Sequence, residues 1–215
     1  MFQKIFNKVT VFIAGVILIF SSICAVFAMP EPNIPTEQVI IEYVSKNTTV
    51  TINPSDSIRT ELVQATNEYI SQRFPKSKLT GEALVMACEK HDFDICFALA
   101  QAEIESGLGT AGKARHTNSP WNVHAWDSRS AQQMNKMGYG YSHPDQSIEP
   151  YIELVKTSYL GGKRTIHDLM KNYVTLSGNR YASDPNYERT LKSTYKRICL
   201  KTPIKDLQQA LKKCI

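Results

Sequence analysis

Apolar side chains recur at helical spacing through most of the chain after residue 56. The first such pattern predicts a helix from about residue 57 to the residue before Pro75. Its apolar face consists of Ile58, Leu62, Ala65 and Tyr69. A second helix is expected to begin after Thr80, whose hydroxyl group can cap its first turn. Further helical patterns cover residues 147–160, 165–173, 185–198 and 203–213. These patterns predict a mainly helical protein.

Residues 94–106 form the most apolar of the predicted helices. Its segment 95–100 reads Ile-Cys-Phe-Ala-Leu-Ala, which is apolar on every side and therefore typical of a helix in the middle of a domain. Gly107 and Gly109 are expected to end it. Residues 109–146 that follow have no clear period, and an irregular segment of this length is usually functional. Two short β-branched segments, 38–44 and 48–52, are expected to pair as a hairpin.

The N-terminus has the pattern of an export signal. Lys4 and Lys8 precede a stretch without charge from residue 9 to residue 30, and Ala28 ends a Val-Phe-Ala triplet suited to cleavage. An uncleaved membrane anchor is the alternative, because the uncharged stretch is long for a signal. We therefore expect a signal or anchor at 1–28, a linker and N-terminal extension at 29–75, the main domain at 76–200 and a tail helix at 201–215. The protein is expected to be secreted or to act in the periplasm or cell envelope.

Charge and cysteine content narrow the classes of function. Without Lys4 and Lys8 the chain has 23 basic against 20 acidic residues, a mild excess that is unlike the basic surface of a nucleic-acid-binding protein. Four cysteines remain after the signal, which in an exported protein favours two disulfides. Proximity in the chain favours Cys88–Cys96 and Cys199–Cys214, and buried free thiols are the alternative. The histidines are scattered without metal-ligand spacing, so neither a metal nor a cofactor is expected.

Glu105 is the candidate acid at the end of the apolar helix. It lies one turn after Gln101 and on the same side, whereas Glu103 points roughly the opposite way. An apolar surround favours the neutral carboxyl group and raises its pKa, as a general acid requires. The alternative is a solvent-exposed glutamate or a structural ion pair.

Four segments then resemble motifs of one family. Residues 100–110 read Ala-Gln-Ala-Glu-Ile-Glu-Ser-Gly-Leu-Gly-Thr and resemble the Ala-Gln-Ala-x-Leu-Glu-Ser-Gly-Trp-Gly motif of glycoside hydrolase family 73, the glucosaminidases. Residues 118–123 resemble that family's Asn-Asn-Leu-Phe-Gly-Ile segment, and 147–151 its Ser-hydrophobic-x-Asp-Tyr segment. Residues 180–187 are similar to its Tyr-Ala-Thr-Asp-Pro-x-Tyr motif. The order of the motifs agrees, and together they cover about 79–198.

The resemblance implies a fold, a substrate and site residues. The fold would be lysozyme-like, α+β but mainly α, with two lobes beside a groove that holds a glycan strand. The substrate would be peptidoglycan, cut after N-acetylglucosamine. We expect the enzyme to be a monomer. The general acid would be Glu105, and Tyr187 would match the active-site tyrosine. A core position is the alternative for Tyr187, and Tyr181 is the alternative tyrosine.

The sequence departs from the family pattern at three points. Leu108 replaces a tryptophan and Asn122 replaces a glycine, which changes the groove wall. The glutamate that many members carry in the small lobe is missing, and Asp127 is the single acid between Glu105 and Asp145. Asp127 is therefore the candidate second carboxylate. The alternative is attack by the N-acetyl group of the sugar itself.

Aromatic residues gather in the irregular segment and suit the flat faces of sugar rings. Trp121, Trp126 and Tyr139 are candidate substrate-binding residues together with Gln101 and Tyr181, and core packing is the alternative for Trp121. The competing functions are a muramidase or lytic transglycosylase on the same fold, and a catalytically inactive glycan-binding module.

Overall fold

The computed structural model of the chain describes residues 53–123 and 129–214. The predicted signal or anchor at 1–28, the hairpin segments at 38–44 and 48–52, Trp126 and Asp127 lie outside the described residues. The described residues all belong to one unit of the chain, Ile52–Ile215.

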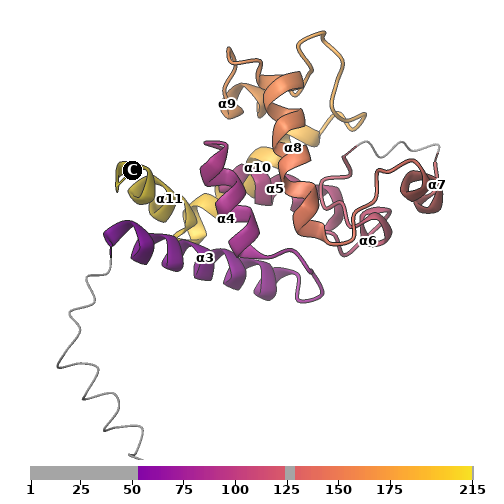
Figure 1. Ribbon diagram of the computed structural model, residues 1–215. Coiled ribbons are helices and arrows are strands. Elements are labelled where there is room, and N and C mark those ends of the chain that lie inside the picture. The colour runs from indigo at the N-terminus through magenta and orange to yellow at the C-terminus, as the bar shows by residue number, and fades with distance from the viewer. Residues whose placement is uncertain (1–52, 124–128, 215) are drawn as a thin grey trace, which may run out of the picture. The chain divides into compact units, whose positions relative to one another are not determined.

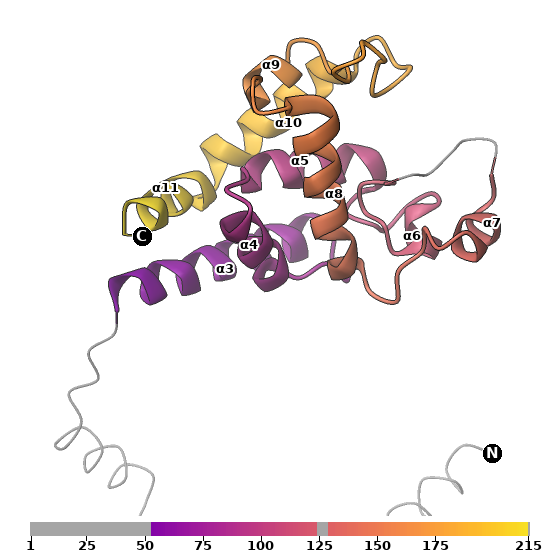
Figure 2. The same cartoon turned by 45° about the horizontal axis from the view of Figure 1, so that its top comes forward.

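Helix α5 (Ile95–Ser106) forms the centre of the core, as the apolar pattern predicted. Nine of its 12 residues are buried. The Asp94 side chain accepts a hydrogen bond from the backbone N–H of Phe97 and caps the first turn. Gly107 ends the helix in the left-handed conformation, with φ of 57°. Figures 1 and 2 show α5 between the other long helices.

Helix α3 (Pro54–Arg73) packs against α4 (Gly81–Lys90) and α11 (Ile204–Cys214), and these two helices contact α5. The Thr80 hydroxyl caps α4 as expected. A Cβ atom at Gly81 would lie 2.8 Å from the carbonyl oxygen of Val63, so only glycine allows α4 to begin this close to α3. Leu62 of α3 and Leu211 of α11 belong to the same hydrophobic core as α5. The core therefore extends beyond the predicted catalytic domain on both sides.

The predicted helix at 147–160 consists of α8 (Ile148–Leu154) and a π-helical continuation, η2 (Val155–Leu160). It is followed by the short helix α9 (Ile166–Leu169). Helix α10 (Tyr187–Lys201) packs along α5 and begins two residues later than the sequence predicted. The carbonyl oxygen of Asp184 accepts from the Tyr187 N–H in a turn before the helix, so Pro185 belongs to that turn.

The segment expected to be irregular contains three short helical pieces. These are α6 (Ala114–Thr117), α7 (Ala131–Lys136) and the 3-10 turn η1 (Pro144–Ser147). Both cartoon views show α6 and α7 together, away from α3 and α11 (Figures 1 and 2). β-Structure in the described residues is one isolated bridge between Val174 and Arg180. The mainly helical class is therefore confirmed. None of the helices in this part of the chain combines the length and apolar character that crossing a membrane requires.

The expected disulfides, Cys88–Cys96 and Cys199–Cys214, are absent, because all four cysteines are free thiols. Cys96, at the start of α5, instead has the Cys199 thiol of α10 as its neighbour. A hydrogen bond that the Cys96 thiol donates to Cys199, together with burial, raises the pKa of Cys96 well above its ordinary value. The pairing by chain proximity is wrong because α5 packs along α10, which brings together cysteines far apart in sequence.

Candidate active site

Glu105 lies in the last turn of α5, and the residues after it fix the end of that helix. The Ser106 hydroxyl donates to the carbonyl oxygen of Pro120 at 2.6 Å and accepts from the Gly109 N–H at 2.8 Å. A Cβ atom at Gly107 would lie 2.9 Å from the Phe74 ring, so the turn needs a glycine for space as well as for its positive φ. The Glu-Ser-Gly-x-Gly pattern thus joins the helix end to residues 118–123.

Three side chains from distant parts of the chain converge on the carboxyl group of Glu105. The Tyr187 hydroxyl donates to Oε1 at 2.5 Å. The Tyr181 hydroxyl and the Asn122 amide lie beside this carboxyl group and act to lower its pKa. Burial raises the pKa of Glu105, and the three polar side chains oppose that rise by stabilising the charged form. Since burial prevails, the carboxyl group keeps its proton at higher pH than an exposed glutamate does.

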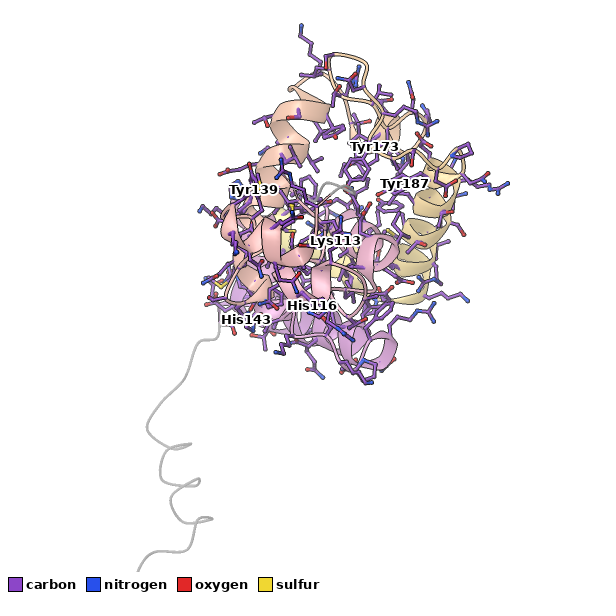
Figure 3. The ribbon with its side chains drawn as sticks, turned by 90° about the vertical axis from the view of Figure 1, so that its right-hand side faces the viewer. Lys113, His116, Tyr139, His143, Tyr173 and Tyr187 are labelled. Atoms are coloured by element: carbon purple, nitrogen blue, oxygen red, sulfur yellow. The ribbon has the colours of Figure 1, made fainter. Side chains whose placement is uncertain are left out.

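A cluster of tyrosine rings provides the apolar surround of Glu105. Tyr173 stacks on Tyr181 with ring centres 4.4 Å apart, and the Tyr187 ring lies 5.3 Å from that of Tyr181. Tyr159 closes the cluster with ring centres 5.0 Å from Tyr173. Figure 3 shows Tyr173 and Tyr187 near one another, on the side of α10. Burial raises the pKa of Tyr187 well above its ordinary value, so its hydroxyl remains a donor.

Gln101 hydrogen bonds with the tyrosine cluster. Its side chain is fully buried, and its Oε1 accepts from the hydroxyls of Tyr151 at 2.8 Å and Tyr173 at 3.0 Å. It lies on the same side of α5 as Glu105, as predicted, but it has no exposed surface for a substrate. Its contacts are those of a residue that orients the tyrosines.

Trp121 belongs to the core, which was the alternative to a role in glycan binding. Its side chain is 1% exposed, its Nε1 donates to the Ala98 carbonyl oxygen at 2.9 Å, and its ring stacks on Tyr151 at 4.6 Å. Tyr139 is half-buried after α7. Figure 3 shows Tyr139 on the opposite side of the view from Tyr187. Among the described residues that the sequence predicted for the site, Tyr181 and Tyr187 are therefore the two whose side chains lie directly beside Glu105.

Glu103 lies on the other side of α5 in a different environment. Its carboxylate accepts from the Tyr69 hydroxyl, from Arg197 at 2.6 Å and from Arg73 at 3.5 Å. Burial acts to raise the pKa of Glu103, but the hydrogen bonds from Arg197 and Tyr69 outweigh it, so the pKa is lowered. The two glutamates thus differ as their spacing predicted. Burial favours the neutral form of Glu105, whereas Glu103 is an ion-paired carboxylate.

Sequence reasoning missed three residues of this arrangement. Asn122 departs from the family pattern, but the sequence does not indicate that it is a neighbour of Glu105. Tyr159 and Tyr173 lie in predicted helices, where nothing local distinguishes a tyrosine that faces the site from one that faces the core. Leu108, expected in the groove wall, is fully buried.

The comparisons with known proteins agree with the motifs. The family model described as glucosaminidase, mannosyl-glycoprotein endo-beta-N-acetylglucosaminidase, matches residues 81–200, which is more than half of the chain. The matched range contains Glu105, Asn122, Tyr181 and Tyr187. No curated protein matches the chain. The resemblance seen in the sequence is confirmed, and with it a lysozyme-like, mainly helical fold and a peptidoglycan substrate. The chain belongs to the glucosaminidase family of glycoside hydrolases.

Proposed function

We propose that the protein is an exported endo-β-N-acetylglucosaminidase that cuts peptidoglycan after N-acetylglucosamine, with Glu105 as its general acid. The observation that carries this proposal is the half-buried carboxyl group of Glu105, whose pKa burial raises and whose orientation Tyr187 fixes at 2.5 Å. A carboxyl group that keeps its proton to higher pH than an exposed glutamate can deliver that proton to the glycosidic oxygen as the bond breaks.

The tyrosines have two tasks in this proposal. Their rings keep water from Glu105 and so favour its neutral form. When the proton has left, the hydroxyls of Tyr187 and Tyr181 donate to the new carboxylate and stabilise it. Tyr187 is also suited to steady the positive charge that develops on the sugar ring.

The second group of the reaction is Asp127 or the N-acetyl group of the substrate. Asp127 lies outside the described residues. Inverting enzymes separate their carboxyl groups by about 6.5–9.5 Å and retaining enzymes by about 5–5.5 Å. We propose Asp127→Asn as the variant that separates the routes: near-total loss supports a carboxylate, and substantial residual activity supports the N-acetyl route.

Export is proposed from residues 1–28, which also lie outside the described region. Cleavage after Ala28 would release the enzyme, and an intact segment would anchor it. The mass of the mature protein isolated from its producing cells separates the two outcomes.

The decisive experiment is digestion of purified peptidoglycan followed by mass spectrometry of the fragments. N-acetylglucosamine at the new reducing end supports the proposal. N-acetylmuramic acid there would indicate a muramidase, and an anhydro sugar a lytic transglycosylase. Glu105→Gln should reduce the rate about 10²–10⁴-fold while binding to insoluble peptidoglycan persists. Binding without any digestion by the parent would indicate the inactive glycan-binding module.

Glu103→Gln is the matched control, because it makes the same chemical change one half-turn away on the same helix. It should cut peptidoglycan at a rate near the parent's at 25 °C. A Glu105→Gln variant that digests peptidoglycan at the parental rate would remove Glu105 from the mechanism.

A further inference from the structure

Asn122 has a backbone conformation that an asparagine adopts at a cost. Its φ is 50°, in the left-handed region that glycine adopts freely. Its backbone N–H donates to the Ser119 carbonyl oxygen at 2.8 Å, which closes a tight turn from Ser119 to Asn122. Glycine would make this turn without strain, so the turn alone gives no reason for an asparagine.

The side chain of Asn122 has a second cost and a specific contact. Its Oδ1 is buried and has no hydrogen-bond partner among the described residues, which is unfavourable for a polar atom. Its Nδ2 donates to the backbone carbonyl oxygen of Glu105 at 3.2 Å. That carbonyl belongs to the last turn of α5, where no further turn of helix supplies a donor.

We infer that Asn122 is a positioning residue for Glu105, holding the backbone of the proposed general acid through an amide that lies beside its carboxyl group. This inference rests on the proposed function of Glu105. Both costs occur at the single residue of segment 118–123 whose side chain reaches Glu105. Unpaired buried groups and strained backbone that persist beside a reactive group are typical of functional sites.

The chemical consequence follows from the polarity of the amide. Amide N–H groups beside a carboxylate favour its charged form, so Asn122 opposes the effect of burial and limits the rise in the pKa of Glu105. Without Asn122 the carboxyl group would be a weaker acid with a less fixed orientation. Proton delivery would be slower, and the group would stay protonated to higher pH.

Asn122→Gly tests the inference, because glycine suits the backbone and removes the amide. The variant should fold and melt at the parental temperature or up to about 4 °C above it, since strain and an unpaired acceptor are removed. The alkaline limb of the activity profile should move up by about half to one pH unit. The kcat should fall several-fold with KM near the parent's. NMR titration of the Glu105 carboxyl carbon should show the same upward shift in pKa without depending on activity.

Asn118→Gly is the matched control. Asn118 has a φ of 51°, and its amide donates to the carbonyl oxygen of Tyr141 at 2.8 Å. It has the same left-handed backbone conformation as Asn122 and the same kind of amide hydrogen bond, but none of its hydrogen bonds involves Glu105. Its pH profile and the pKa of Glu105 should equal the parent's.

Two results would overturn the inference. One is an Asn122→Gly enzyme with unchanged kcat, pH profile and carboxyl pKa. The other is a variant that loses melting temperature and activity in proportion, which would make Asn122 a structural turn residue. Failure of the proposed function has a different signature: the parent and the Asn118→Gly control would both leave peptidoglycan intact.

Discussion

Replacing Glu103 by glutamine should destabilise the protein without changing its chemistry. The Glu103 side chain is 10% exposed, and its carboxylate faces Arg197 and Arg73, which are 30% and 55% exposed. Removing one partner of a fully buried ion pair costs about 3–5 kcal/mol. Because water reaches both arginines, and glutamine can still accept a hydrogen bond, we expect a smaller loss of about 1–3 kcal/mol.

The assay is thermal unfolding of the parent and the variant at pH 7. For a protein of this size the expected loss lowers the melting temperature by about 3–10 °C. Glu153→Gln is the matched control, because Glu153 is an exposed helical glutamate with no side-chain hydrogen bond among those of the described residues. Its melting temperature should change by less than about 2 °C.

The pH dependence gives a second readout, with its sign set by the lowered pKa of Glu103. The stabilisation by its carboxylate is fully present above the unfolded-state pKa, ordinarily 4.5, and is lost as the pH falls through the lower pKa of the folded state. The difference between parent and variant should therefore shrink in acid. Equal melting temperatures at pH 7, or a difference that stays constant down to pH 3, would refute the reasoning.

Three further predictions concern other parts of the structure. Tyr187→Phe keeps the ring but removes the hydroxyl that donates to Glu105. Peptidoglycan digestion should slow about 10–100-fold, and the alkaline limb of its pH profile should move to higher pH. Digestion at the parental rate would exclude a role for this hydroxyl. Gly81→Ala forces a Cβ atom against the Val63 carbonyl oxygen and should lower the free energy of unfolding by about 1–3 kcal/mol, measured with urea. An unchanged free energy of unfolding would mean that α4 shifts freely. Native thiol labelling should modify exposed Cys214 quickly and buried Cys88 only on unfolding, and equal rates would contradict the core as described.

The sequence by itself determined the elements whose signals act within one or two turns of chain. Thr80 caps α4 as predicted, and Asp94 caps α5 at the predicted start of that helix, because a side-chain oxygen needs only the N–H groups two or three residues ahead. The apolar run in α5 predicted a central helix, and the two-residue spacing of Glu103 and Glu105 predicted opposite environments. These signals are local, so no knowledge of the packing was needed to interpret them.

The tertiary structure alone decided which distant side chains meet. Tyr187 reaches Glu105 from 82 positions along the chain, and Cys96 lies beside Cys199 rather than Cys88, because α10 packs along α5. The family motif pointed to Tyr187, but nothing local to residue 122 indicated an amide beside Glu105. A side chain's partners across a helix interface depend on how whole helices pack, and a local pattern of apolar residues predicts that a face is buried without predicting what covers it.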